Sequence, residues 1–548
     1  MRFRKHLFWA TCITLLINAA AMFSPVINSG DAITYAAISQ HIVQSHDWAS
    51  LVLDGHDWLD KPHLPFWITA LFFKLGGVSA FTYILPGFIF HLIGAYYTYR
   101  MARLLYDKKT AALAVLIYVS IFNLMDASIE VKAETYLIGQ IMPACYYWLR
   151  YDARFRVKYL LLGALFTAMA VMTKGIFTLI TISSGLVCLW LYQKQWTRLL
   201  SVKWLAALSL SMLFVAPELA ALHSQFKHPE IAGSGQTVSS FRFFFWDSQF
   251  GRFFNTGPIQ NRNSHPLYFV PVFLWAFLPW TMVFFAAARA EFRKFGKASS
   301  SERAALVFLS GAFCVTFLMF SASRFQFDYY IDIIFPFAAI LCARYFTASD
   351  IGGRLFIAQM GLVSFLVLLT IALCIYVMNP ALSAIIAAVA LGLIYYGYST
   401  RTESRNFRAI LCSAYSINIL YIFLTLLTAL TFTKYSVAHN AARLFDTQPG
   451  IPIYVYQMPE VARELALYSE VPCHALDTVE ALSQIKGKYN LLVRHEQAIQ
   501  IQPGSAQLEK LASMQLVVHK TGTFNKLLKL AKGTWPLETI DFLQSAPR

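Results

Sequence analysis

Long apolar segments recur along this chain and are separated by shorter polar connections. Runs of about 16 to 23 apolar residues are long enough to cross a lipid bilayer as helices. About thirteen such segments are predicted, at 6–27, 81–99, 110–125, 134–149, 158–173, 175–193, 203–223, 267–288, 304–321, 328–346, 355–377, 381–398 and 409–432. The pattern therefore predicts a polytopic all-α membrane protein.

Three longer polar regions interrupt the apolar pattern, at 28–80, 224–266 and 433–548. In the last region, strand-like and helix-like segments alternate, which is typical of a small α/β domain. The strand-like segments are 451–456, 489–494 and 515–520, and the helix-like segments are 459–468, 505–514 and 524–532. We therefore expect a transmembrane domain over 1–432, followed by a soluble α/β domain over 433–548. The second domain has no glycine-rich phosphate loop or nucleophile elbow, which favours an accessory role.

The first polar region has a helical pattern of its own. Residues 32–46 place Ala32, Tyr35, Ala36 and Ile42 on one stripe, with polar residues on the opposite side. This arrangement is typical of an amphipathic helix that lies along a membrane surface.

A short motif of charged residues and proline, Asp60-Lys61-Pro62-His63, precedes a second interfacial helix that is predicted at about 63–75. Proline disfavours helical geometry in the residue before it. We therefore expect Asp60 and Lys61 to approach this helix in an extended conformation.

Composition agrees with insertion into a membrane. Of the 548 residues, 57% are hydrophobic and only 14% are charged, whereas soluble domains average about 25% charged residues. The net charge of +16 does not indicate nucleic-acid binding, because the basic residues are spread over short loops instead of one solvated face. The eight cysteines predict no disulfide framework, since nearly all of them lie in or beside apolar segments.

The basic residues also predict the orientation of the chain. They gather in every second loop, and the positive-inside rule places these loops and the N-terminus in the cytoplasm. The three long polar regions then lie on the other side, which for the inner membrane of a bacterium is the periplasm. Segment 6–27 could instead be a cleaved signal peptide, but the alternation of charge works when the segment is retained as the first span.

Ionisable residues that topology does not explain fall on this predicted periplasmic side. Charges at membrane depth are costly and usually line a cavity. Cations from separate loops could clamp a lipid-linked phosphate, and carboxylates beside them could orient the cations or remove a proton from an acceptor hydroxyl. The candidates are Asp31, Asp60, Lys61, His63, Glu130, Lys132, Glu134, Lys174, Asp247, Arg252, Arg262, His265, Arg324 and Asp328.

Several candidates also have a purely structural interpretation, which the sequence leaves open. These interpretations are a helix N-cap for 32–46 at Asp31, a solvated helix start for Glu130, Lys132 and Glu134, a turn between spans at Lys174-Gly175, and an aromatic interface belt over 241–266. A divalent metal could be bound by His63, His265 and carboxylates, but no compact ligand spacing supports such a site. No cofactor is expected to be required.

Short motifs follow one another along the first 345 residues. In order, they are Asp31 with Tyr35, Ala36 and Ile38; Asp47-Trp48; Asp60-Lys61-Pro62 with Trp67; Glu134; Val171 to Gly175; Phe244, Phe245, Trp246, Arg252 and Phe253; Pro266, Pro271 and Val272; and Ser321, Arg324 and Tyr329. This ordered set resembles the bacterial GT-C membrane glycosyltransferases of the protein-mannosyltransferase superfamily, most closely the aminoarabinose transferases that act on lipid A. Beyond residue 345, only the architecture is similar.

The resemblance implies transfer of a sugar from a polyprenyl phosphate to an acceptor at the periplasmic face, with inversion at the anomeric carbon. The implied acceptor is lipid A, or another glycan, lipid or protein hydroxyl, and membrane lipids surround the chain. Asp31 and Glu134 would be catalytic, and Lys61, Lys174, Arg252 and Arg324 would bind the donor or acceptor phosphate. Further substrate contacts are expected from Tyr35, Asp60, His63, Glu130, Lys132, Arg262, His265 and Tyr329.

The chain departs from the pattern of the aminoarabinose transferases at several positions. It has Asp31-Ala32 in place of Asp-Glu, Asp60 in place of Glu, Glu134 in place of Asp, His63 in place of a small or apolar residue, and Gln249 where a histidine is common. These departures weaken the prediction of the substrate more than the prediction of the reaction class. The alternative class is a transporter or flippase of a lipid-linked sugar, which should show broken helices at mid-membrane and repeat symmetry between its halves.

Overall fold

The computed structural model of the chain describes ten stretches, which divide into two compact units. The described residues are 2–23, 30–129, 131–225, 240–261, 265–378, 380–399, 404–448, 450–501, 508–517 and 524–545. The first unit takes its residues from 1–21, 47–68 and 85–423, and the second takes its residues from 22–46, 69–84 and 424–548. The unit that contains the C-terminal region therefore also contains part of the first polar region, and the domain boundary at 432 stays a prediction.

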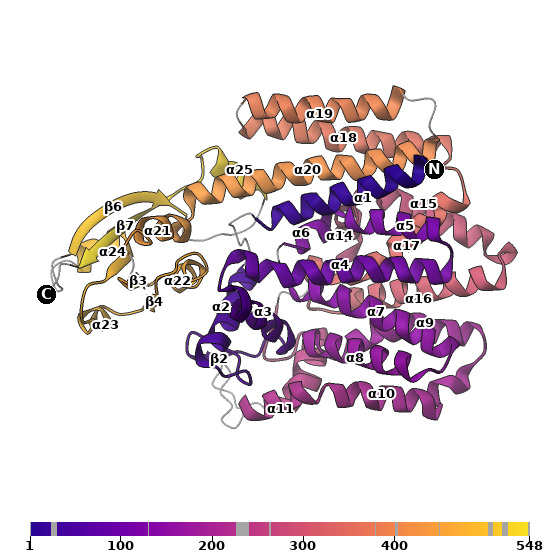
Figure 1. Ribbon diagram of the computed structural model, residues 1–548, viewed down its shortest axis with the longest axis horizontal. Coiled ribbons are helices and arrows are strands. Elements are labelled where there is room, and N and C mark those ends of the chain that lie inside the picture. Colours follow the sequence, from indigo (N-terminus) through magenta and orange to yellow (C-terminus); the bar gives the residue numbers. More distant parts are fainter. Residues whose placement is uncertain are drawn as a thin grey trace. The chain divides into compact units, whose positions relative to one another are not determined.

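The first unit is a bundle of long helices (Figure 1). Its α-helices are α1 (Arg2–Ala21), α5 (Lys108–Val119), α6 (Phe122–Ala127), α7 (Ala133–Ala153), α8 (Val157–Lys174), α9 (Thr178–Tyr192), α10 (Val202–Phe214), α11 (Ala216–Gln225), α12 (Ser240–Arg242), α13 (Arg252–Phe254), α14 (Phe269–Ala276), α15 (Thr281–Lys294), α16 (Ser300–Ala322), α17 (Phe335–Ala348), α18 (Gly353–Val377) and α19 (Pro380–Ser399). The 3₁₀ segments are η1 (Trp196–Leu200), η3 (Phe295–Lys297) and η4 (Asp328–Ile334), and η2 (Phe243–Gly251) is a π-helix. Three helices contribute residues to both units: α3 (Leu64–Gly76), α4 (Ala80–Leu105) and α20 (Arg405–Tyr435).

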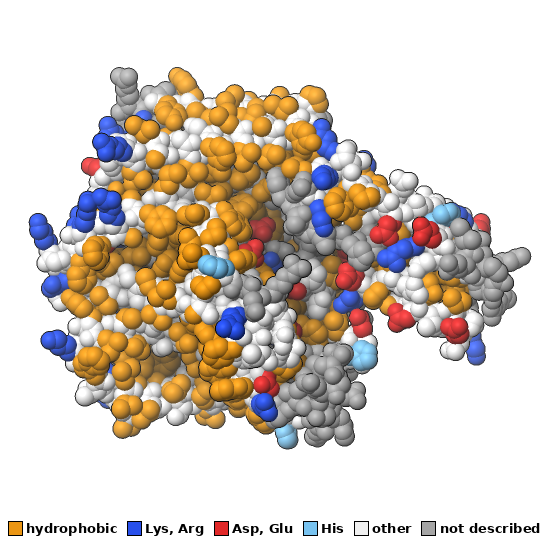
Figure 2. Space-filling model, turned by 180° about the vertical axis from the view of Figure 1, so that it is seen from behind, with side chains coloured by type: hydrophobic (Ala, Val, Ile, Leu, Met, Phe, Trp, Pro, Cys, Tyr) orange, Lys and Arg blue, Asp and Glu red, His pale blue; other side chains and the backbone are white. Residues whose placement is uncertain are grey.

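Each predicted membrane segment contains at least one helix among its described residues. Among the described residues, seven helices are long and apolar enough to cross a membrane, or eight if the pair Phe269–Ala276 and Thr281–Lys297, bent by 110°, is one span. Hydrophobic side chains cover much of the outer face of the helical unit, and lysines and arginines gather at one end of it (Figure 2). The chain is thus a mostly helical, multi-pass membrane protein, as predicted, and the count of thirteen spans stays a prediction.

Small residues bring the helices α9 and α16 close together. A Cβ atom added to Gly185 would lie 2.7 Å from the carbonyl oxygen of Phe308, and one added to Gly311 would lie 2.6 Å from Cys188 Cβ. Between membrane helices, where no water is displaced, such backbone approach increases dispersion contacts and stabilises the pair. The close packing of α9 against α16 fixes the position of α9, whose first residue, Thr178, follows the turn after Lys174.

The second unit contains a mixed five-stranded sheet, which confirms the predicted C-terminal α/β fold. Its order is β4-β3-β5-β7-β6, with β3, β4 and β5 parallel and β7 and β6 antiparallel to their neighbours. The strands are β3 (Ile453–Tyr456), β4 (Cys473–Leu476), β5 (Asn490–Arg494), β6 (Leu508–Leu516) and β7 (Glu538–Ser545), and the helices are α2 (Gly30–Ser45), α21 (Val437–Phe445), α22 (Pro459–Leu465), α23 (Val479–Ser483), α24 (His495–Ile501) and α25 (Phe524–Ala531). Its core includes Phe445, Ile453, Leu492 and Phe542.

One element of this unit was predicted wrongly. Segment 505–514 was expected to be a helix, but residues 508–516 form strand β6. The strand pairs with β7 from Leu508 opposite Ser545 to Leu516 opposite Glu538, with one irregularity between Lys510 and Ala512. The ladder of hydrogen bonds to β7 outweighs the helix-favouring Leu, Glu, Lys and Ala residues of this segment.

Candidate functional site

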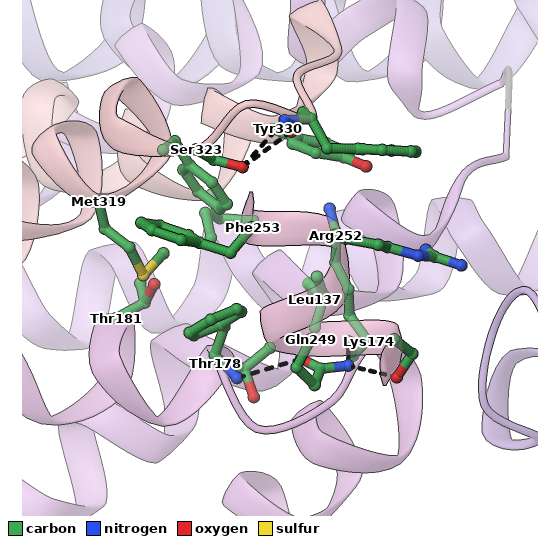
Figure 3. A pocket seen from close by; sticks show the side chains of 15 residues that line it. Leu137, Lys174, Thr178, Thr181, Gln249, Arg252, Phe253, Met319, Ser323 and Tyr330 are labelled. Atoms are coloured by element: carbon green, nitrogen blue, oxygen red, sulfur yellow. Dashed lines mark hydrogen bonds between the residues drawn. The ribbon is translucent and has the colours of Figure 1, made fainter. Parts of the chain in front are cut away.

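Two adjoining pockets of the helical unit share the side chains of Lys174, Ser248, Gln249 and Arg252. We call one of them the charged pocket, because it is lined also by the ionisable side chains of Asp60, Lys61, His63 and Glu218. The other is mainly apolar (Figure 3), and its remaining lining is Leu137, Phe177, Thr178, Thr181, Phe253, Met319, Phe320, Ser323, Phe325, Tyr330 and Ile333. The shared residues therefore stand between a charged compartment and an aromatic one.

Asp60 is the centre of a three-residue ion cluster in the charged pocket. Its carboxylate pairs with both Lys61 and Arg252, and Arg252 Nη2 also donates to the Asp60 carbonyl oxygen at 2.8 Å. Burial opposes ionisation of Asp60, but the charges of Lys61 and Arg252 and their hydrogen bonds outweigh it and hold the pKa of this carboxyl well below its ordinary value. Asp60 is therefore ionised and fixes both cations at the pocket.

Glu134 and Lys174 form a second ion pair beside the first. Glu134 lies in the first turn of α7, where it is 2% exposed, and Lys174 is the last residue of α8. Lys174 Nζ also lies 3.6 Å from the ring centroid of Tyr330, within the range of a cation–π contact. The two clusters together set three cations, Lys61, Lys174 and Arg252, against two carboxylates, which leaves one positive charge in excess.

The turn after Lys174 fits closely against Gln249. Gly175 has φ +99°, a backbone conformation that residues other than glycine rarely adopt. A Cβ atom at this position would overlap the amide group of Gln249. The Gln249 amide donates to the Lys174 carbonyl oxygen at 3.2 Å, as the dashed line in Figure 3 shows. Glycine at 175 thus allows Gln249 to support the backbone that carries Lys174.

His63 is held by a carboxylate that lies 155 positions further along the chain. Its backbone N–H donates to Glu218 Oε2 at 3.0 Å, its Nδ1 lies 2.9 Å from Glu218 Oε1, and its Nε2 lies 3.0 Å from the carbonyl oxygen of Ala49. Both side chains are fully buried. Since all of these groups are satisfied by protein atoms, the pair anchors the segment that carries Asp60 and Lys61 to α11.

The aromatic pocket places two cations beside several aromatic rings. Phe177, Phe253 and Tyr330 line a space of about 70 Å³ together with Lys174 and Arg252. Figure 3 labels the last four of these residues. Arg252 also lies over the ring of Phe325, 5.6 Å from its centroid. Arginine and lysine bind phosphate oxygens by charge-assisted hydrogen bonds, so this pocket offers phosphate-binding groups beside aromatic rings.

The structure brings together some of the predicted site residues but not all of them. The charged pocket is lined by Asp60, Lys61, His63, Lys174 and Arg252. Glu134 does not line it but forms an ion pair with Lys174, which does. Lys132 Nζ lies 4.4 Å from the ring centroid of Tyr329. The side chains of Arg324 and His265 are exposed; the Arg324 backbone N–H donates to Phe253, and His265 Nδ1 accepts from Leu267. Glu130 and Arg262 lie outside the described residues.

Two further predicted site residues, Asp31 and Tyr35, belong to α2 in the second unit. Tyr35 is buried and Asp31 is exposed. The interpretation of Asp31 as the N-cap of a helix over 32–46 is wrong, because α2 begins at Gly30 and Asp31 lies in its first turn. A carboxylate in that position is favoured by the helix dipole.

A second structural interpretation also fails. Glu134 was a candidate for a solvated helix start, but it is buried and paired with Lys174. The turn expected at Lys174-Gly175 is present, and it coexists with the ion pair. Within the described part of the chain, no three His, Cys, Asp or Glu side chains are grouped as metal ligands would be.

Sequence reasoning missed Glu218 and Tyr330. Glu218 is a single acid inside an apolar helical segment, Val202–Gln225, and a carboxylate in such a segment is itself a signal of a functional or paired site. Tyr330 offered no comparable signal, because 28 tyrosines are spread over the chain. The one indication in the sequence was that Tyr330 directly follows Tyr329, which was predicted to contact the substrate.

A membrane-helix bundle with an ionic cluster at an aromatic pocket and an attached α/β domain defines the class, which is the GT-C fold. The crystal structure of ArnT from Cupriavidus metallidurans bound to undecaprenyl phosphate has the same fold, with a TM-score of 0.72 over 98% of each chain at 15% identity. The predicted fold class is therefore confirmed.

Sequence comparison gives the same relatives. A profile of the family described as dolichyl-phosphate-mannose-protein mannosyltransferase matches residues 60–220. The undecaprenyl phosphate-alpha-4-amino-4-deoxy-L-arabinose arabinosyl transferase 2 of Proteus mirabilis is 26% identical over 344 residues, which are 62% of this chain and 58% of that protein. The corresponding transferase of Edwardsiella ictaluri is 29% identical over 325 residues, 58% of this chain and 54% of its own length. The chain thus spans less than two thirds of the length of these relatives, and its resemblance to them is clear.

Proposed function

We propose that this protein transfers a sugar from a polyprenyl phosphate to an acceptor at the periplasmic face of the bacterial inner membrane. The observation that carries the proposal is the meeting of Lys61, Lys174 and Arg252 at the border of an aromatic pocket. A lipid phosphate needs cations for its phosphate group and apolar surface for its chain, and the two adjoining pockets provide one each. The names of the relatives make undecaprenyl phosphate 4-amino-4-deoxy-L-arabinose the first donor to test, with lipid A as the first acceptor.

The cations are proposed to act on the leaving group. An acceptor oxygen attacks the anomeric carbon from the face opposite the phosphate, the bond between that carbon and the phosphate oxygen breaks, and polyprenyl phosphate leaves with the electron pair. Negative charge develops on the phosphate during this step, and Lys174 and Arg252 stabilise it. Asp60 and Glu134 hold these cations in place before the donor arrives, so little reorganisation is needed.

The acceptor decides whether a base is required. If it is a hydroxyl of a sugar or protein, a carboxylate must take its proton, and Asp31 is the proposed base with Glu134 as the partner acid. If the acceptor is a phosphate of lipid A, it is already ionised, and Asp31 would orient the substrates instead. Exposure of the Asp31 side chain is compatible with contact to a substrate in either case.

The orientation of the protein is part of the proposal. Basic side chains gather at one end of the helical unit (Figure 2), and the positive-inside rule assigns such an end to the cytoplasm. The site residues come from the connections that alternate with these basic loops. We therefore assign the pockets and the C-terminal α/β unit to the periplasmic side.

Purified protein in detergent is incubated with a panel of polyprenyl-phosphate sugars and lipid A, and the release of polyprenyl phosphate is measured. We expect turnover with at least one donor, and its loss in Lys61→Ala, Lys174→Ala and Asp31→Asn. Lys108→Ala, which removes an exposed lysine at the start of α5, is the matched control and should retain full activity. Full activity in the Lys61 and Lys174 variants would show that the site is assigned wrongly.

A transporter of lipid-linked sugars is the second candidate, because one helix pair, Phe269–Ala276 and Thr281–Lys297, is broken with a bend of 110°. The residues at the break, Phe277, Leu278, Pro279 and Trp280, carry no charge, whereas transporters use such breaks to bind ions or substrates. Movement of a fluorescent lipid-linked sugar across proteoliposome membranes without sugar transfer would favour this alternative.

A further inference from the structure

The C-terminal unit contains a basic stretch that the proposed reaction does not use. Between Glu509 and Glu538 there is no acidic residue, and five lysines occur: Lys510, Lys520, Lys526, Lys529 and Lys532. Lys510 is paired with Asp541 at 2.8 Å. Three of the others lie in or directly after one short helix, α25 (Phe524–Ala531).

Helix α25 has an apolar side and a basic side. Leu530 is buried, Leu527 and Leu528 are half-buried, and Lys529 and Lys532 are exposed. Beyond the helix, the half-buried ring of Trp535 lies 5.2 Å from Lys526 Nζ. Leucines, lysines and a tryptophan in this arrangement are typical of segments that lie in the headgroup region of a bilayer.

The chain around α25 is attached to the end of a membrane-spanning helix. Helix α20 is one of the seven candidate spans and ends at Tyr435. The backbone N–H of Val517, directly after strand β6, donates to the Tyr435 carbonyl oxygen at 2.9 Å, and Val517 forms an isolated β-bridge with Ser436. After α25, a Cβ atom at Gly533 would lie 3.9 Å from the Tyr435 hydroxyl. The residue that ends strand pairing before α25 is thus bonded to the end of α20, and the residue two positions after α25 lies close to the same tyrosine. Figure 1 shows α25 near the end of α20.

We propose that α25 docks on anionic lipid headgroups of the leaflet at which α20 ends, through a basic face formed by Lys526, Lys529 and Lys532. The charges of this face are complementary to phosphate headgroups, and anionic membrane surfaces attract basic segments close to them. The short distance from Tyr435 makes a lipid surface available to α25 without any other protein. Docking holds the five-stranded sheet against the bilayer.

Hydrogen–deuterium exchange on the full-length protein tests this proposal. The protein is reconstituted in nanodiscs of phosphatidylcholine alone and of phosphatidylcholine with phosphatidylglycerol. We expect the amides of residues 524–532 to exchange several-fold more slowly in the anionic discs, and high salt to remove most of this difference because it screens exposed charges. Exchange in β3, β5 and β7 should be the same in both discs.

Two variants with equal changes in charge separate a specific docking face from a general effect of charge. Lys529→Gln/Lys532→Gln should lose the slowing in anionic discs. Lys486→Gln/Lys488→Gln removes two exposed lysines from the connection between α23 and β5 and should keep it. Equal exchange of 524–532 in the two lipids, or equal loss in both variants, would overturn the proposal. The comparison of lipids and salt in the unmodified protein decides the question even if the first variant folds poorly.

Discussion

Glu218 Oε1 lies 2.9 Å from His63 Nδ1, and neither side chain is exposed to solvent. One proton lies between these atoms whichever of the two holds it, and His63 Nε2–H donates to the carbonyl oxygen of Ala49. The pair joins α11 to the residue that follows Pro62. It therefore sets the position of Lys61, which is two residues earlier and lines the same pocket.

Removal of the Glu218 carboxylate should destabilise the protein strongly. Glu218→Ala leaves the His63 ring and the His63 backbone N–H buried without their hydrogen-bond partner, and each buried polar group that loses its partner costs about 1–3 kcal/mol. Glu218→Gln keeps an oxygen acceptor and should cost less. Thermal unfolding in detergent measures both effects.

The control for this prediction is an ion pair that is open to solvent. Glu302 and Arg344 are paired with 39% and 21% of their side chains exposed, and such pairs contribute about 0–1 kcal/mol. Glu302→Gln should therefore change the unfolding temperature little. A Glu218→Ala protein as stable as Glu302→Gln would contradict the anchoring role of the His63 pair.

The pH dependence of stability should reflect the Asp60 cluster. Lys61 and Arg252 hold the pKa of Asp60 below the value of about 3.9 that an unfolded aspartate has. The contribution of the cluster is therefore complete above that pH and is lost as the pH falls through the folded pKa. We expect Asp60→Asn to be less stable than the wild type by a constant amount between about pH 5 and 8, with the gap closing in acid. A gap that changes across the neutral range would exclude this explanation.

The helical part of the fold could be predicted because the length of an apolar run is a local property of the sequence. Strand β6 could not, because its state depends on β7, whose first residue, Glu538, lies 22 positions after Leu516. Segment 508–516 has residues that favour a helix in isolation. Only the pairing partner, which is distant in sequence, decides in favour of a strand.

The cations of the site could also be predicted, since Lys61, Lys174 and Arg252 fall on the side of the membrane to which the sequence pattern assigns few positive charges. Their partners were harder to assign. Glu134 lies 40 positions before Lys174, and Asp60 lies 192 positions before Arg252. The sequence alone does not tell which carboxylate pairs with which cation, because pairing depends on how α7, α8, α13 and the connection before α3 pack together.

The ring of Tyr330 should contribute to the position of Lys174. Its centroid lies 3.6 Å from Lys174 Nζ, and cation–π contacts contribute about 0.5–2 kcal/mol, depending on desolvation. Tyr330→Leu should therefore raise the KM for the lipid donor by roughly two- to thirtyfold, whereas Tyr330→Phe keeps the ring and should behave like the wild type. Steady-state kinetics of the two variants test this. Equal losses in both would assign the effect to the hydroxyl group.

The turn at Gly175 should be intolerant of any side chain. The φ of +99° strains every other residue, at a cost of about 1–3 kcal/mol, and a Cβ atom would overlap the Gln249 amide. Gly175→Ala should therefore displace Gln249 and Lys174 and lower turnover sharply. Gly296→Ala is the control, because a Cβ atom there meets no described atom within 4 Å.

A double variant separates the overlap from the backbone strain at Gly175. Gln249→Ala removes the amide that the new Cβ atom would meet, so Gly175→Ala/Gln249→Ala should be more active than Gly175→Ala alone. Neighbouring residues that share such a contact are not additive, whereas distant ones usually are. If turnover in the double variant equals the product of the two single losses, the contact between Gly175 and Gln249 does not position Lys174. Recovery to the level of Gln249→Ala alone would instead assign the whole defect to the overlap.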